Sequence, residues 1–169
     1  EVLLCMVERR KGGETGIAAV HCLEGPAVWT WTDRNPWAQH LLEATLACME
    51  RRKPGTPRDN VKQPILFLLE YFSGLEAAVY ILNGHVERRG FGAQIRGIKE
   101  AACTEFWTRY QKPWSHATGL TYYLEQLFVT GRTFYPVERA LLTTGALAAL
   151  MDSGYDGSRR LETPHLNVT

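Results

Sequence analysis

The stretch from residue 64 to residue 108 constrains the fold more than any other part of this chain. Two apolar runs of strand length, residues 65–72 and 75–82, are separated by Ser73-Gly74, and Asn83-Gly84 follows the second run at once. Asn-Gly is a strong hairpin signal, because both residues tolerate the positive φ that a type I′ turn needs. We therefore predict an antiparallel meander of three or four strands, which the rest of the chain covers or extends.

Composition limits the class of protein. A chain of 169 residues, 45% hydrophobic and 22% charged, is long and apolar enough to bury one sizeable core. The net charge of +1 argues against a nucleic-acid partner and a polybasic membrane surface, and no apolar run approaches the roughly 20 residues of a membrane span. The chain starts inside an apolar run, residues 2–7, without a methionine. We therefore expect one cytoplasmic domain, residues 1–169, cut from a longer polypeptide.

The cysteines and histidines carry no metal or redox signature. Cys5, Cys22, Cys48 and Cys103 are scattered without a C-x-x-C pair, a pattern typical of buried, reduced thiols. None of the five histidines forms H-x-x-x-H or pairs with a cysteine at zinc spacing, so we expect no metal site.

Patterns before the meander predict three strands and a helix. Residues 2–9 and 16–23 are strand-like on either side of a polar turn, so we expect a hairpin. Residues 28–32 alternate with period 2 and predict a third strand. Asn35 and Pro36 suit the start of a helix, whose apolar face continues to Met49.

Two more helices and a tail follow the meander. The first begins at Ser115 and ends at Gly131, where a residue in the left-handed conformation is expected. The second begins after Pro136 and ends before Gly154, and residues 159–168 predict an edge strand or an extended tail. The expected apolar stripes are Leu120, Leu124, Leu127 and Phe128 in the first helix, and Val137, Leu141, Thr144, Ala148 and Met151 in the second.

The order of these elements predicts an α+β fold with a mostly antiparallel, open-faced sheet and about three helices packed on one face. Both alternations of the first meander strand are apolar, with Ile65 and Phe67 on one side and Leu66 and Leu68 on the other. Three helices cover only one face, so we expect the other face to bind a second copy of the chain.

Two segments carry candidate chemistry, and each also has a plainer interpretation. His40 and Glu43 lie three apart on the predicted helix, where a histidine beside a carboxylate can serve as a general acid or base. Such pairs are also common on exposed helix surfaces. The polar turn at residues 8–15 is either simply solvated or contacts a substrate through Lys11, Glu14 and Thr15.

Gly90 and Gly92 lie in a strand-like segment and superficially suggest a dinucleotide fingerprint. The third glycine is misplaced and no helix opens there. Glycines inside a strand more often mark a bulge or a close approach of backbone, which is the interpretation that we favour.

Three long segments together resemble one known family: VERRKGGETGIAAVHCLEG at residues 7–25, EYFSGLEAAVYILNGHV at 70–86 and YPVERALLTTGALAALMDSGYDGSRRLETPHL at 135–166. They are similar to the C-terminal domain of oxidoreductases of the glucose–fructose oxidoreductase / inositol dehydrogenase (Gfo/Idh/MocA) family. The resemblance implies an N-terminal Rossmann domain, missing from this chain, that binds NAD or NADP. It also implies that the second domain closes over the nicotinamide, shapes a sugar or polyol pocket and forms homo-oligomers through its open sheet face.

The resemblance implies that His40 is the catalytic histidine, and we expect Glu43, its neighbour on the helix, to orient it. Pro36 stands four residues earlier, where the family has its catalytic aspartate, so the usual acid–base pair is incomplete. The family's lysine would lie in the missing half, and this chain alone is expected to bind neither NAD nor NADP. Two other functions stay open: a structural assembly domain, and a small-molecule-binding domain that has lost catalysis.

Overall fold

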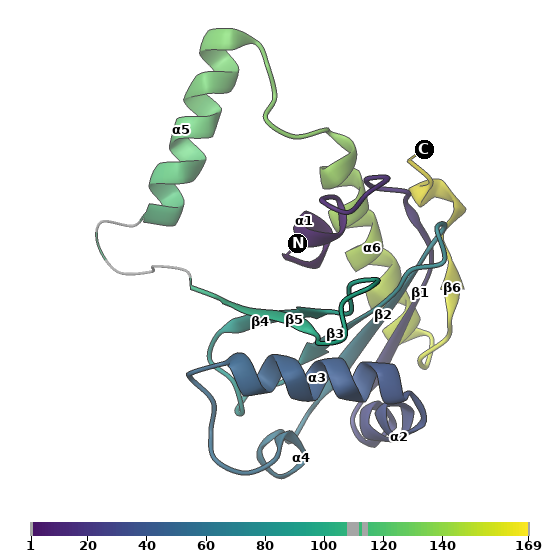
Figure 1. Ribbon diagram of the computed structural model, residues 1–169. Coiled ribbons are helices and arrows are strands. Elements are labelled where there is room, and N and C mark those ends of the chain that lie inside the picture. The colour runs from purple at the N-terminus through teal and green to yellow at the C-terminus, as the bar shows by residue number, and fades with distance from the viewer. Residues whose placement is uncertain (1, 108–111, 113–114, 169) are drawn as a thin grey trace.

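Four antiparallel strands form the main sheet of the computed structural model, which describes residues 2–107, 112 and 115–168. Their spatial order is β3-β2-β1-β6, so β3 and β6 are the edge strands. A second, two-stranded sheet pairs β4 with β5 (Figure 1). The strands span Ile17–Glu24 (β1), Ile65–Tyr71 (β2), Glu76–Ile81 (β3), Arg89–Ala93 (β4), Ala102–Phe106 (β5) and Leu161–Glu162 (β6).

Helices precede, separate and follow the strands, and the predicted α+β class with an open antiparallel sheet is confirmed. The helices predicted from Pro36, Ser115 and Pro136 are present as α3, α5 and α6. Among the described residues, none of the helices is long and apolar enough to cross a membrane. The helices span Val2–Val7 (α1), Pro26–Arg34 (α2), Pro36–Cys48 (α3), Pro57–Asn60 (α4), Ser115–Thr130 (α5), Glu138–Tyr155 (α6) and, as a 3₁₀ turn, Pro164–Leu166 (η1).

The predicted meander is present as the β2–β3 hairpin, but its second half leaves the main sheet. Gly74 turns the chain between β2 and β3 with a φ of 78°, as expected for a tight turn. Gly84 makes a second turn with a φ of 97°, yet β4 then pairs with β5 and not with β3. Leu82, the residue after β3, is buried in one cluster with Leu46 and Met49 at the end of α3.

The strand predicted for residues 2–9 is wrong, because this segment forms α1. Leu4 and Val7 are its buried side chains, and their spacing of three places them on one side of a helix. A short apolar run has no periodicity that separates a strand from a helix, so the run alone misled the prediction. The hairpin expected with residues 16–23 is therefore absent, and β1 pairs with β2 and β6.

The strand predicted for residues 28–32 is also wrong, since these residues lie within α2. Gly25, with a φ of 59°, follows β1, and Pro26 occupies the first helical turn. Val28 and Thr32 are the buried residues, and Thr32 Oγ1 donates a hydrogen bond to Val28 O at 2.8 Å. A spacing of four residues fits one face of a helix and also the period of 2 of a strand. The alternating pattern therefore could not separate a strand from a helix.

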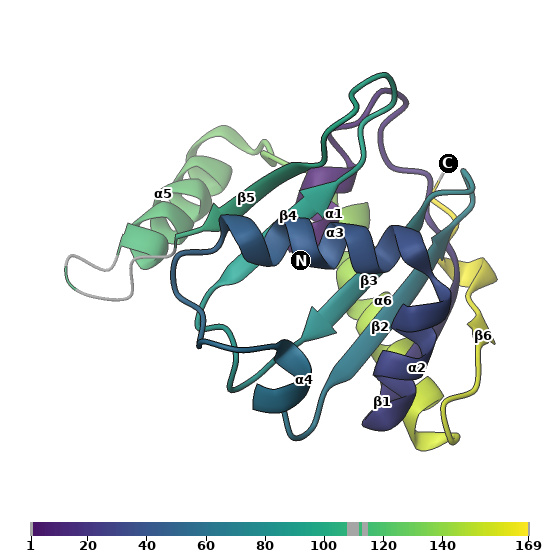
Figure 2. The same ribbon diagram turned by 60° about the horizontal axis from the view of Figure 1, so that its bottom comes forward.

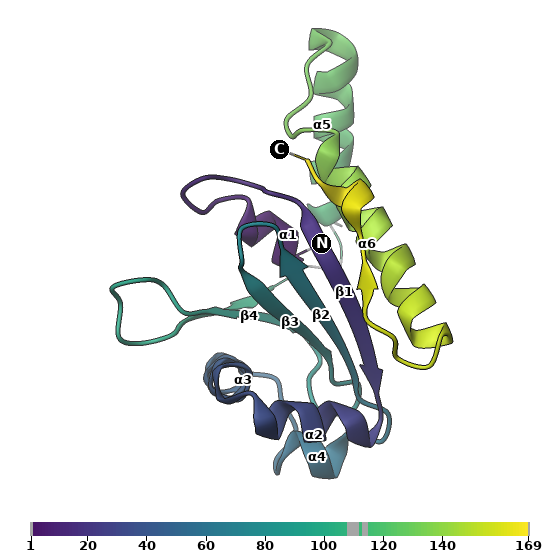
Figure 3. The ribbon, with the colours of Figure 1, turned by 90° about the vertical axis from the view of Figure 1, so that its right-hand side faces the viewer.

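Helices cover both faces of the main sheet. On one face α6 runs along β1 (Figure 3), and together with α1 it encloses Leu69 and Phe67 of β2. On the other face α2 packs through Val28 against Leu66 and Leu68 of β2. Helices of the same chain therefore cover both apolar faces of β2. Self-association stays a prediction, but an uncovered face of the sheet is no longer a reason for it.

The buried face of α6 differs from the predicted stripe. The expected stripe, from Val137 to Met151, lies on the exposed side of the helix. A Cβ at Gly145 would lie 2.5 Å from Cδ2 of Leu166 in η1, so small residues allow η1 to approach α6 closely. The buried residues of α6 are Leu142, Ala146, Ala149, Leu150 and Ser153.

All four cysteines are free, but burial is confirmed for Cys22 alone. Burial raises the pKa of the Cys22 thiol, and the nearby Glu24 carboxylate raises it further. Cys5 and Cys103 are partly exposed, and Cys48, at the end of α3, is exposed.

Ser153 joins α6 to β1 inside the core. Its side chain is fully buried, and its Oγ accepts a hydrogen bond from Cys22 N at 2.9 Å and donates one to Arg159 O at 2.5 Å. The hydroxyl therefore pairs a backbone N–H of β1 and ties the chain after α6 back to the helix.

We expect Ser153→Ala to lower the free energy of unfolding by about 1–3 kcal/mol, because it leaves the buried Cys22 N–H without a partner. Urea unfolding measures this loss. Thr143→Ala is the matched control, since Thr143 Oγ1 only donates to Arg139 O of the same helix at 2.8 Å. A loss for Ser153→Ala no larger than that of the control would contradict this role.

Candidate functional site

An open groove of about 2360 Å³ runs along β3, an edge strand of the main sheet. Residues of α1, α3, β4 and the end of β5 also line it. Figure 2 shows α3 lying across β4, and the two elements are in contact. The groove therefore forms where both sheets and two helices meet, which makes it a product of the tertiary fold.

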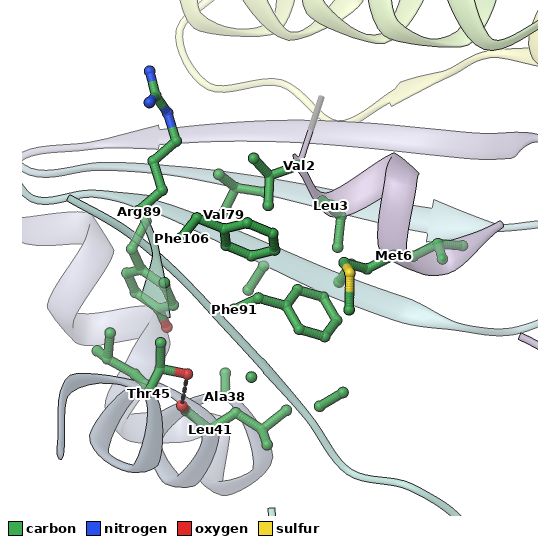
Figure 4. Close-up of a pocket in the computed structure, with 18 of the residues that line it drawn as sticks. Val2, Leu3, Met6, Ala38, Leu41, Thr45, Val79, Arg89, Phe91 and Phe106 are labelled. Atoms are coloured by element: carbon green, nitrogen blue, oxygen red, sulfur yellow. Dashed lines mark hydrogen bonds between the residues drawn. The ribbon is translucent and has the colours of Figure 1, made fainter. Parts of the chain in front are cut away.

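Apolar side chains from α1, α3, β3 and the second sheet converge on the floor of the groove (Figure 4). Such a floor suits an apolar group and offers no hydrogen bonds to a hydroxylated ligand. The residues that make up the apolar floor are Leu3, Met6, Leu41, Val79, Phe91 and Phe106.

The lining of the groove is cationic. Among the described residues, seven lysine and arginine residues line the groove, against two glutamates. Several of these cations are engaged: Arg51 pairs with Glu87 at 3.7 Å, and Arg88 with Glu105 at 3.5 Å. Within the described part of the chain, Lys11 and Arg96 have no ion pair or hydrogen bond. These two side chains can therefore bind an anionic or hydroxylated group.

The structure brings two of the predicted site residues, His40 and Lys11, to this one groove. Both side chains are exposed, His40 on α3 and Lys11 in the connection between α1 and β1. Glu43 lies outside the groove lining and accepts a hydrogen bond from Gln39 Nε2 at 2.9 Å on the exposed side of α3. That Glu43 orients His40 stays a prediction.

The two other predicted substrate contacts, Glu14 and Thr15, hold the turn that carries Lys11. Glu14 Oε1 accepts hydrogen bonds from Thr15 N at 2.8 Å and Gly16 N at 3.0 Å. Thr15 Oγ1 accepts one from Arg10 Nη2 at 2.8 Å. Neither residue lines the groove, so in this structure they position the turn and do not face the floor.

Both ends of this turn are anchored. Arg10 also donates to Gly13 O at 3.0 Å, and its guanidinium lies 5.4 Å from the centre of the Tyr71 ring. Arg139 of α6 donates from Nε to Glu8 Oε2 at 2.9 Å, which ties the residue after α1 to α6. The position of Lys11 is thus set by contacts with β2 and α6.

Gly90 and Gly92 bring β4 against α3, which confirms the predicted close approach of backbone. A Cβ at Gly92 would lie 2.2 Å from Thr45 Oγ1, and one at Gly90 would lie 2.6 Å from Thr45 Cγ2. Thr45 Oγ1 donates to Leu41 O at 2.6 Å, which keeps the hydroxyl on the helix side (Figure 4). Any side chain at these positions would push the second sheet off α3 and change the groove.

Tyr80, next to the last residue of β3, lines the groove. Its hydroxyl is 2.9 Å from Thr32 Oγ1 of α2. Burial raises the pKa of Tyr80, and the hydrogen bond with Thr32 opposes this effect. Tyr80 is therefore neutral at physiological pH and serves as a hydrogen-bonding group, not as an anion.

A buried histidine lies outside the groove lining. His85 is 2% exposed, and its Nδ1 accepts a hydrogen bond from Asn60 Nδ2 at 3.0 Å. Burial lowers the pKa of His85, and the charges of Arg52 and Lys53 lower it further. His85 is thus held neutral and anchors the end of α4 through Asn60, a structural role.

Sequence reasoning missed the apolar floor and Arg96. A single arginine at a turn has no pattern that separates it from a solvated side chain. Arg96 lies in the connection between β4 and β5, and it lines the groove that Lys11 also lines.

Chemically, the groove combines an exposed histidine and lysine with an apolar floor. Among the residues described, no group of three or more His, Cys, Asp or Glu side chains is placed to hold a metal ion. The chain matches no protein-family model, no curated protein and no solved structure.

Proposed function

We propose that this chain is the substrate-binding and oligomerisation domain of a nicotinamide-dependent sugar or polyol oxidoreductase. The sequence resemblance supports this function, and the α+β fold with an open antiparallel sheet agrees with it. The observation that carries the proposal is that His40 and Lys11, which are far apart in the sequence, line the same groove.

Three of the described helix starts do not suit a dinucleotide, and the proposal assigns NAD or NADP to a domain outside this chain. A pyrophosphate site usually needs a glycine turn that leads into a helix whose first N–H groups are available. The helices α2, α3 and α4 each have proline in the first turn, which removes a donor.

Within the proposed site, His40 exchanges a proton with a substrate hydroxyl, and Lys11 binds a neighbouring hydroxyl oxygen. An imidazole suits the first task because its ordinary pKa lies near neutrality. An ammonium suits the second because it offers three donors on a flexible stem. Pro36 provides no proton-transfer group, so in this proposal His40 acts without the aspartate of the family's pair.

NMR titration of this chain with myo-inositol and with glucose tests the substrate half of the proposal. We expect the ring signals of His40 and the ε-methylene signals of Lys11 to shift together and saturate below about 10 mM, since Michaelis constants usually lie between about 1 μM and 1 mM. His165 and Lys62 are exposed residues outside the groove lining and serve as internal controls.

Shifts at His165 and Lys62 equal to those at His40 and Lys11 would contradict the site, and so would no shift at all. The second result would favour a structural assembly domain. NADH and NADPH added alone are expected to leave the spectrum unchanged, because the proposal places the pyrophosphate site in a domain outside this chain.

A further inference from the structure

The helix α5 has no part in the site described so far. It stands away from the rest of the domain (Figure 1) and packs against no other helix or strand of the described chain to any substantial extent. Its large apolar side chains are exposed to solvent. The exposed apolar side chains of α5 are Leu120, Tyr122, Tyr123, Leu124, Phe128 and Val129.

An uncovered helix of this kind is not stable by itself. Leu120, Leu124 and Phe128 recur every four residues and form one apolar side of a 16-residue helix. Isolated helices near this length are marginal in water even when they are rich in alanine. Phe128 is 85% exposed, so the apolar side needs a partner surface.

The groove along β3 has the size and chemistry of that surface. A 16-residue helix is about 24 Å long and about 10 Å wide, so it displaces roughly 1,900 Å³. The groove holds about 2360 Å³, whereas sites for small molecules usually hold about 300–1,000 Å³. Its floor is apolar, as the exposed side of α5 requires.

Charge is also complementary. In the part of the chain that the structure describes, seven cations line the groove against two glutamates. Between residues 115 and 130 the chain has no lysine or arginine and one acid, Glu125. A helix without cations enters a cationic groove without like-charge repulsion.

We infer that two copies of this chain pair by reciprocal insertion, with α5 of each copy lying in the β3 groove of the other. Such an exchange is two-fold symmetric and closes on itself. One side of α5 covers roughly 400 Å² by the dimensions of a helix. Two helices in two grooves then bury roughly 1,600 Å² in total, which is the size of a standard stable interface.

This inference deepens the oligomerisation half of the proposed function and is independent of the substrate half. The partner helix covers the apolar floor and reduces the groove towards the size of a small-molecule site. His40 and Lys11 are exposed. Failure of the NMR titration would leave the pairing untouched, and a monomeric chain would leave the titration untouched.

Sedimentation velocity on the purified chain tests the pairing with two lesions and a control. The helix lesion is Leu124→Lys with Phe128→Lys, both on exposed residues. The groove lesion is Phe91→Lys, and Ile95→Lys, at a 45% exposed lining residue, replaces it if the first variant fails to fold. Met151→Lys, on the exposed side of α6, is the matched control.

We expect the parent chain and Met151→Lys to be dimers, and each lesion to weaken dimerisation by about 30-fold or more, as removal of central interface anchors does. A mixture of the two lesioned chains keeps one intact helix and one intact groove, so it should form mixed dimers weaker than the parent. If the helix lesion weakens dimerisation and the groove lesion does not, the result would indicate α5–α5 pairing and overturn the inference. A monomeric parent at about 100 μM, or dimers that survive both lesions, would overturn it as well.

Discussion

Gly16→Ala is expected to lower the free energy of unfolding by about 3 kcal/mol or more, which combines backbone strain with overpacking. Gly16 has a φ of 77°, a conformation that favours glycine. A Cβ there would lie 2.2 Å from Leu166 O and 2.9 Å from Asn167 Cα. Because both neighbours are backbone, no side-chain rotation relieves the contact. The substitution must displace either the start of β1 or the segment that follows η1.

Gly13→Ala is the matched control for this prediction. Gly13 also has a positive φ, 68°, but a Cβ there meets nothing within 4 Å. Gly13→Ala should lower the free energy of unfolding only by the strain of a left-handed residue, about 1–2 kcal/mol. Urea unfolding of both variants separates strain from collision. Equal losses for Gly13→Ala and Gly16→Ala would show that the C-terminal segment yields easily, contrary to this account.

The elements that the sequence predicted correctly are those specified by local patterns. The β2–β3 hairpin has its turn at Ser73-Gly74, and α3 begins at Pro36, where proline suits the first helical position. The chain direction reverses after α5 at Gly131, which has a φ of 66°. In each case a single residue with a special backbone preference marks the boundary.

Predictions failed where a short apolar run fitted both the strand and the helix period. They also failed where tertiary contacts determined the path of the chain. Residues 2–7 and 28–32 are too short for an apolar pattern to separate a strand from a helix. The path of β4 depends on the burial of Leu82 beneath α3 and on the glycines that meet Thr45. No pattern near Leu82 in the sequence indicates those contacts.

The residues of the candidate site were also predicted only in part. His40 and Lys11 were predicted because titratable and cationic side chains are visible in a sequence. The floor was not, since Phe91 and Phe106 come together with α1 only after the second sheet has formed (Figure 4). Glu14 and Thr15 were predicted to contact substrate, and the structure places them within the turn that positions Lys11.

In the proposed function, His40 performs proton transfer for a nicotinamide-dependent oxidation. The direct measurement is the initial rate of NAD⁺ or NADP⁺ reduction by the longer polypeptide that the proposal requires, with His40→Ala against the parent. We predict that kcat falls by about 100-fold or more, the usual loss when a general acid–base group is removed. His165→Ala, at an exposed histidine outside the groove lining, should retain the parent rate. A His40→Ala rate within about twofold of the parent, where a lost base should cost about 100-fold, would contradict the account.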